Sequence, residues 1–314
     1  MRLVGTSADC ILELAFQAES GSLTIRGERN DRHGYATLAM TAPDEIVSLR
    51  PLPFDTAALA PNGRLIAGID PKGALLCRDL VRDSEWRLHR LRSNEMRLTF
   101  SADSRFLFGL CNRSMGRTML LRCPTGMRDS ATFDTIANWF HAFAVHPCGN
   151  IIALYESSQR ITLARFDGEG EKDTWPPGHD EQELSCNWAG RILAMRSWPL
   201  NLNVHDIRFS PDGRLLACTA GAHVALWDVE ERRQIHALIS HAGMVTSMAF
   251  NATGSQIITG SHDRSVRMWD VSTGRLLRTY RWPIGPVLAV ALSQDELTAA
   301  AGDNAGHVVL WDLD

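Results

Sequence analysis

The 314-residue sequence lacks the features that mark several large classes of protein. No apolar run approaches the roughly 20 residues that cross a bilayer as a helix, and the N-terminal stretch MRLVGTSADCIL has too short an apolar run for a signal peptide. The seven cysteines are scattered and form no CxxC pair. We therefore expect reduced core cysteines in a cytoplasmic protein, without a disulfide framework or a zinc site.

The usual signatures of catalysis and of cofactor binding are also missing. There is no G-x-G-x-x-G or P-loop pattern, and histidines and carboxylates do not recur at metal-ligand spacings. A net charge of −4 disfavours nucleic acid as a partner. We predict no enzyme activity, no catalytic residue, no cofactor and no bound metal.

What the sequence does contain is a repeated Trp–Asp pair. The first pair lies 42 residues before the second, and the second lies 42 before the third. Internal repetition at this period is typical of propellers and other repeat architectures. The pairs are Trp227–Asp228, Trp269–Asp270 and Trp311–Asp312.

The residues before each pair follow one outline, which predicts three strands joined by turns. In the segment 204–230, short apolar runs are separated by a Pro-Asp-Gly turn and a polar break. Similar outlines occupy 54–80, with Cys77 expected at the tryptophan position, and 140–167, with Phe166 expected there. Residues 95–123 also fit, and residues 1–50 fit more loosely. We expect the first strands to begin near Ile11, Phe54, Glu95, Phe140, Val204, Val245 and Val287.

A fourth strand closes each unit. The segments 190–199 (GRILAMRSWP) and 274–283 (GRLLRTYRWP) are nearly the same and lie between consecutive units. Four strands in about 42 residues cannot bury both faces alone, so the units must stack on one another. We predict an all-β ring of sheets in which the repeated tryptophan is a packing element.

These motifs resemble the WD-repeat (transducin beta-like) β-propeller family. The resemblance implies a seven-bladed ring, or six blades if residues 1–50 fold otherwise, closed by the N-terminal strand MRLVGT completing the last blade. It also implies a hydrogen-bonded structural tetrad in one unit. His241, Thr259 and Asp263 superficially resemble a catalytic triad, but with Trp269 the family pattern assigns them a structural role.

One interval departs from the period. Between the units that begin at Phe140 and Val204 there are about 22 extra residues, which we assign to an acidic, Pro-containing loop at 168–190. The loop either is a solvated insertion or binds a partner through Trp175 or Trp188. We expect residues 1–314 to form a single propeller domain that carries this loop.

Strand parity predicts which residues share a face of the ring. The second turn of each unit and the link between units emerge on one face, and the first and third turns on the other. Aromatic and arginine side chains on the first face are candidate anchors for a protein partner. The alternative is that the tryptophans among them cover the blade ends. The candidates are Trp139, Trp198, Asn203, Met244, His262, Arg264, Trp282 and Arg92.

Arg92 also belongs to an arginine-rich stretch, 82–97, assigned to an outer strand. That stretch is either a charged solvent-facing fringe or a dock for an acidic or phosphorylated peptide.

Three functions remain open at this point. The first is a non-catalytic scaffold or adaptor that holds protein partners within a larger assembly, as a monomeric ring. The second is an enzyme that uses the central funnel, for which His141, His205 and Asp206 are the inner-strand candidates. The third is a reader of short modified or acidic peptides on the tryptophan-bearing face. The sequence favours the first.

Overall fold

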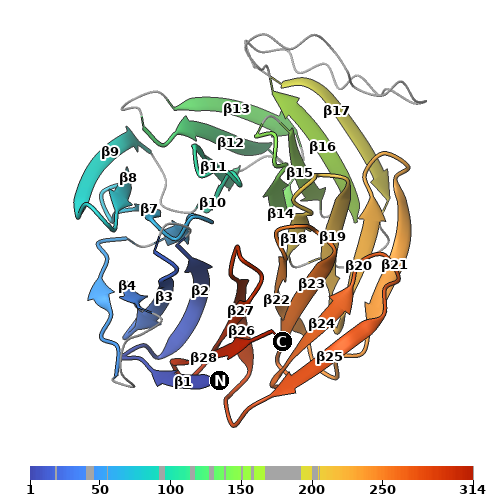
Figure 1. The fold of residues 1–314 in the computed structure, drawn as a ribbon. Helices are drawn as coiled ribbons and strands as arrows, with labels where there is room; N and C mark the ends of the chain where they lie inside the picture. The colour runs from blue at the N-terminus through green and yellow to red at the C-terminus, as the bar shows by residue number, and fades with distance from the viewer. Residues whose placement is uncertain are drawn as a thin grey trace.

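The strands of the computed structural model form seven four-stranded antiparallel sheets around a common axis (Figure 1). The structure describes the chain except for residues 18–19, 40–45, 55, 92–95, 114–116, 127–130, 138, 150, 157–158, 167–191, 200–203, 205 and 314. For residues 112–113, 117, 134–137, 165–166 and 192–199 it describes the backbone alone. We number the sheets blades 1 to 7 along the chain.

The first four blades follow one another without interruption, each with its strands in sequence order. Blade 1 contains β2 (Cys10–Phe16), β3 (Leu23–Arg29), β4 (Arg32–Leu38) and β5 (Arg50–Pro51). Blade 2 contains β6 (Thr56–Leu59), β7 (Leu65–Ile69), β8 (Ala74–Asp79) and β9 (Ser84–Arg90). Blade 3 contains β10 (Arg97–Phe100), β11 (Phe106–Arg113), β12 (Arg117–Pro124) and β13 (Thr132–Ala137). Blade 4 contains β14 (Phe140–Val145), β15 (Ile151–Glu156), β16 (Arg160–Phe166) and β17 (Ile192–Pro199).

The remaining blades contain the three Trp–Asp pairs. Blade 5 contains β18 (Ile207–Phe209), β19 (Leu215–Ala220), β20 (His223–Asp228) and β21 (Arg233–Ile239). Blade 6 contains β22 (Val245–Phe250), β23 (Gln256–Ser261), β24 (Ser265–Asp270) and β25 (Leu276–Arg281). Blade 7 contains β26 (Val287–Leu292), β27 (Thr298–Asp303), β28 (His307–Asp312) and β1 (Arg2–Gly5).

The two ends of the chain close the ring. Strand β1 pairs antiparallel with β28, and Leu3 lies opposite Val309. The backbone N–H of Thr6 donates to the Gly306 carbonyl at 3.0 Å, and the two termini lie close together in Figure 1. The predicted seven blades and the closure by the N-terminal strand are both confirmed.

The hydrophobic core is divided among the interfaces between blades. Seven clusters of buried side chains each join two neighbouring blades, including one between blades 7 and 1. Trp227, Trp269 and Trp311 each lie in the cluster that their blade shares with the preceding one. Each sheet thus covers its neighbour's apolar face, as the stacking argument requires.

The predicted strand positions agree closely with the observed ones. The inner strands begin at Cys10, Thr56, Arg97, Phe140, Ile207, Val245 and Val287. The largest displacement is in blade 5, where Val204 is buried ahead of the strand rather than within it. The two nearly identical segments form the outer strands β17 and β25.

The predicted tryptophan position is wrong in blades 2 and 4. Strand register aligns Arg78, not Cys77, with Trp269, because Arg78 lies opposite Ile66 as Trp269 lies opposite Ile257. The Arg78 guanidinium lies 5.8 Å from the centroid of the Tyr35 ring in blade 1, so it still packs toward the preceding blade.

In blade 4 the aligned residue is Ala164, which lies opposite Ile152. Phe166 is two residues further along. The aromatic side chain therefore does not mark the position that the hairpin register aligns with tryptophan.

The cysteine prediction holds only in part. None of the six described cysteines is in a disulfide, but Cys148 is exposed and Cys10 is only half-buried. Burial raises the pKa of the Cys77 thiol to about 12. The seventh cysteine and the proposed loop at 168–190 lie outside the described residues, so the loop assignment stays a prediction. In the described chain no helix is long and apolar enough to cross a membrane.

Candidate functional site

The most ordered polar network lies in blade 6. The Trp269 Nε1–H donates to Thr259 Oγ1 at 3.0 Å, and Thr259 Oγ1 lies 2.8 Å from His241 Nε2. On its other side, His241 Nδ1 lies 2.9 Å from Asp263 Oδ2. Tryptophan can only donate and carboxylate can only accept, so Thr259 accepts from Trp269 and His241 Nδ1 carries the proton that it donates to Asp263. A neutral His241 with its proton on Nδ1 fits both ends of the chain.

Electrostatics agree with this protonation state. Burial lowers the pKa of His241 and outweighs the nearby Asp263 carboxylate. Burial would raise the pKa of Asp263, but hydrogen bonds from Ser265, Ala242 and His241 hold it well below its usual range. Thr259 is fully buried and Trp269 is 2% exposed. The network thus joins the segment before β22 to β23, β24 and the turn between them, and we call it the brace.

The brace positions a surface patch. The segment before β22 is tied to the β23–β24 turn by the Ala242 N–H, which donates to Asp263 Oδ2 at 3.0 Å. The Ser261 hydroxyl donates to the Gly243 carbonyl at 2.9 Å. The His262 N–H donates to the Met244 carbonyl at 2.9 Å. Here we define the blade-6 rim as Met244, His262 and Arg264, whose side chains are all exposed.

The same face recurs in other blades. In three further places a backbone hydrogen bond joins the second turn of a blade to an inter-blade link or to the residue that ends the link: Leu91 with Gly73, Val245 with Gly221, and Asn304 with Pro286. The link and the second turn therefore emerge together, as strand parity predicts. Trp139, which directly precedes β14, is 48% exposed.

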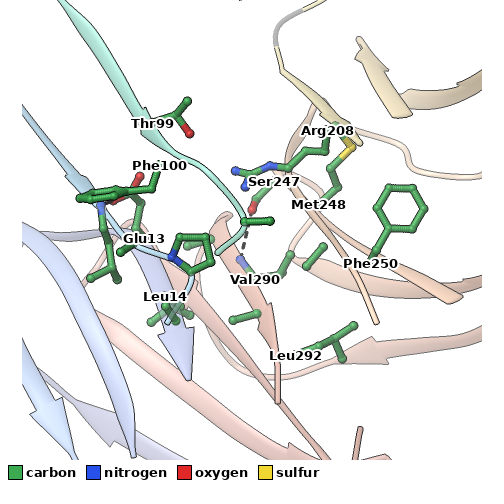
Figure 2. Close-up of a pocket in the computed structure, with 18 of the residues that line it drawn as sticks. Glu13, Leu14, Thr99, Phe100, Arg208, Ser247, Met248, Phe250, Val290 and Leu292 are labelled. Atoms are coloured by element: carbon green, nitrogen blue, oxygen red, sulfur yellow. Dashed lines mark hydrogen bonds between the residues drawn. The ribbon is translucent and has the colours of Figure 1, made fainter. Parts of the chain in front are cut away.

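The ring also encloses a central cavity of about 390 Å³ that is lined by the inner strands. It shares Glu13, Thr99 and Arg208 with an adjoining cavity of about 320 Å³. Figure 2 shows the Arg208 guanidinium extending from blade 5 into this space, toward the side from which Glu13 projects.

Each acidic group of the channel is paired with an arginine. Glu13 Oε2 lies 2.6 Å from Arg26 Nε and accepts the Leu59 N–H at 2.7 Å. Asp206 Oδ2 lies 3.3 Å from Arg208 Nε. The attraction of Asp206, and then of Glu13, raises the pKa of the Arg208 guanidinium, so this group is permanently charged.

Comparison with protein-family models supplies the deciding observation. The model described as WD domain, G-beta repeat matches residues 197–228 and 232–270, the segments that contain the first two Trp–Asp pairs. The seven closed blades and the blade-6 network accompany this match. The chain belongs to the WD40 repeat β-propeller family.

Among the curated relatives, two are named as subunits and one as a splicing factor. The chain is 32% identical over 114 residues to target of rapamycin complex subunit wat1 of Schizosaccharomyces pombe, which is 35% of each chain. It is 26% identical over 169 residues to the pre-mRNA-splicing factor cwf17 of the same yeast, covering 52% of this chain and 48% of that one. It is 28% identical over 118 residues to eukaryotic translation initiation factor 3 subunit I of Pyricularia oryzae, covering 35% and 34%. In each match the chain spans less than half the length of the relative.

The WD40 structure places the predicted partner-binding residues in different settings. Met244, His262, Arg264 and Trp139 are exposed on one face. Trp282 is instead half-buried: its ring stacks on Tyr280 at 5.7 Å and lies 4.5 Å from Trp311. For Trp282 the structure thus supports the alternative of covering the blade end. Asn203 and Arg92 lie outside the described residues, as does the side chain of Trp198.

The arginine-rich stretch is not one surface. Arg87 and Arg90 lie on the outer strand β9 as expected, but Arg97 begins the inner strand β10 and lines the channel. The stretch contains a link between blades, so its two ends belong to opposite edges of neighbouring sheets. The outer-strand assignment of Arg97 is wrong.

The funnel residues considered for catalysis do not converge in the described part of the chain. Asp206 lines the channel and bonds Arg208, His141 is exposed, and His205 is not described. Among the described residues no three histidine, cysteine or carboxylate side chains gather closely enough to hold a metal. The sequence did not lead us to predict a role for Glu13 or Arg208. Alignment of the seven first strands would have identified Arg208, because five of the seven strands have alanine at its position.

Proposed function

We propose that this WD40 propeller is a non-catalytic scaffold that holds protein partners within a multiprotein assembly, with the blade-6 rim as a docking site. The observation that carries the proposal is the bracing of Met244, His262 and Arg264 by the buried tetrad. A surface whose backbone is already ordered loses less conformational entropy when a partner binds.

The chemistry of the rim suits a protein partner. Methionine adapts to irregular apolar surfaces, and arginine is enriched at binding hot spots. Met244 is 39% exposed and Arg264 is held at a φ of 63°, a conformation fixed by the tight β23–β24 turn. The membership of related WD40 proteins in a target of rapamycin complex and in translation initiation factor 3 supports an assembly role for this chain.

Affinity purification from the native cell tests the proposal. The variant Met244→Ala/His262→Ala/Arg264→Ala is expected to lose a partner that the unchanged ring retains in stoichiometric amount, with its thermal midpoint within about 2 °C of the unchanged ring, since surface changes alter stability little. The control is Arg214→Ala/Leu297→Ala, which removes an arginine and an apolar side chain from first turns on the opposite face.

Retention of the partner by the rim variant would refute the docking site. Recovery of no stoichiometric partner by the unchanged ring would refute the scaffold function itself.

A further inference from the structure

The middle of the central channel is lined by one residue from each inner strand. Strand register aligns these positions, because each lies one residue before the strand's last apolar side chain. Five of the seven are alanine, one is threonine, and one is Arg208. They are Ala15, Ala58, Thr99, Ala144, Arg208, Ala249 and Ala291.

Small side chains on six blades leave room in front of the single arginine. The Arg208 side chain keeps 54% of its surface accessible although it lies inside the ring. Its accessible surface therefore faces the channel cavity, around which the seven blades are arranged. A cavity of about 390 Å³ is within the size range of small-molecule sites.

The Arg208 guanidinium has more hydrogen-bond donors than its contact with Asp206 uses. Asp206 engages only Nε, at a distance of 3.3 Å. Within the described residues, no side chain or carbonyl accepts a hydrogen bond from the two terminal nitrogens of Arg208. The planar pair of N–H groups that remains matches the two oxygens of a carboxylate.

The charges near Arg208 are two carboxylates, while a further arginine, Arg97, lines the adjoining cavity. The carboxylates favour a ligand with a single negative charge over a dianion. Asp206 and Glu13 both lie near enough to shift the pKa of the guanidinium. They would repel a phosphate or a dicarboxylate, whereas a monocarboxylate can be held by the arginine alone. The remaining lining is mixed: it includes the rings of Phe100, Phe209 and Phe250 beside polar side chains such as Thr99 and Ser247.

From this geometry we propose that the channel binds a small monocarboxylate with an apolar body, its carboxylate accepting hydrogen bonds from the terminal nitrogens of Arg208. The body lies among the aromatic side chains of the inner strands. This site is independent of the blade-6 rim, which lies on one face of the ring.

The test is calorimetric titration of the full chain with benzoate and with hexanoate, each accompanied by a thermal-shift measurement. We expect both to bind and to raise the midpoint, while benzyl alcohol and inorganic phosphate bind at least about tenfold more weakly, a difference of about 1.4 kcal/mol. Arg208→Ala is expected to weaken benzoate binding by about tenfold or more. This variant should fold, because five other blades carry alanine at the same position.

Two further variants separate a binding role from a structural one. Arg214→Ala removes an exposed arginine from the same blade and should leave benzoate binding unchanged. Ala249→Leu fills channel space on the blade next to Arg208 and should weaken binding while Arg208 remains. The proposal is overturned if the unchanged chain binds neither acid, if phosphate binds as well as benzoate, or if Arg208→Ala binds benzoate with undiminished affinity.

Discussion

At the scale of single residues, the side chains that most resemble catalytic groups are the ones from which solvent is excluded. His241 is buried, with its Nδ1 bonded to Asp263 and its Nε2 lying 2.8 Å from the Thr259 hydroxyl oxygen. A neutral histidine in this position links a tryptophan of one strand to an aspartate of a turn. These residues resemble a catalytic triad, but because they are buried we assign them the structural role of holding the turn and the strands in place.

The repeated tryptophans allow the energy of this link to be measured. Trp269 Nε1 donates to Thr259, whereas the Trp227 Nε1 has no acceptor among the described residues because Cys218 takes the threonine's place. Trp269→Phe should destabilise the ring by about 1–2 kcal/mol more than Trp227→Phe, since both lose similar apolar area and only the first loses a hydrogen bond. Urea denaturation of the two variants measures the difference. Equal losses would show that the buried network contributes no net stability.

At the scale of strands and turns, the first turns of blades 2 and 5 contact the preceding blade. The Gly63 carbonyl of blade 2 accepts the Thr24 hydroxyl of blade 1 at 2.6 Å. In blade 5, a Cβ added to Gly213 would lie 1.8 Å from the His146 ring of blade 4. These contacts join consecutive sheets on the face opposite the rim.

Two glycines of blade 5 test this contact. Both have positive φ, 76° at Gly213 and 60° at Gly221, but a Cβ at Gly221 would meet nothing within 4 Å. Gly221→Ala should cost about 1–2 kcal/mol from backbone strain alone. Gly213→Ala should cost roughly 1–3 kcal/mol more, because His146 must move. Thermal denaturation of both variants provides the comparison, and equal midpoints would mean that the His146 ring yields without cost.

Elements of this kind also show what the sequence could and could not predict. Apolar alternation and turn residues placed the inner strands within a few residues, because those signals are local. The register of the third strands was misassigned at Cys77 and Phe166, because hairpin pairing is not visible in a tryptophan-based pattern. The channel arginine was missed for a related reason: the significance of Arg208 appears only when seven strands are aligned and brought to one axis.

At the scale of the whole molecule, the ring is a chain of seven equivalent interfaces, and one of them joins segments from opposite ends of the sequence. Arrays of this type gain stability mainly from contacts between neighbours. The interface between blades 7 and 1 includes Val4 from β1 together with Ile11 and Ile25 from blade 1. The last blade is completed only when the N-terminal strand is in place. The packing of this strand therefore determines whether the ring stays closed.

Substitutions on β1 test that coupling. Val4 is 1% exposed and Leu3, its neighbour, is 42% exposed, because successive side chains point to opposite faces of the strand. Val4→Asp should destabilise the protein by about 3 kcal/mol or more, since a carboxylate would be buried without a partner. Leu3→Asp should change stability by about 0.5 kcal/mol or less. Chemical denaturation gives the free energies, and limited proteolysis should cleave blade 7 faster in the Val4 variant only. If blade 7 resisted proteolysis equally in both, the N-terminal strand would not be what holds the ring closed.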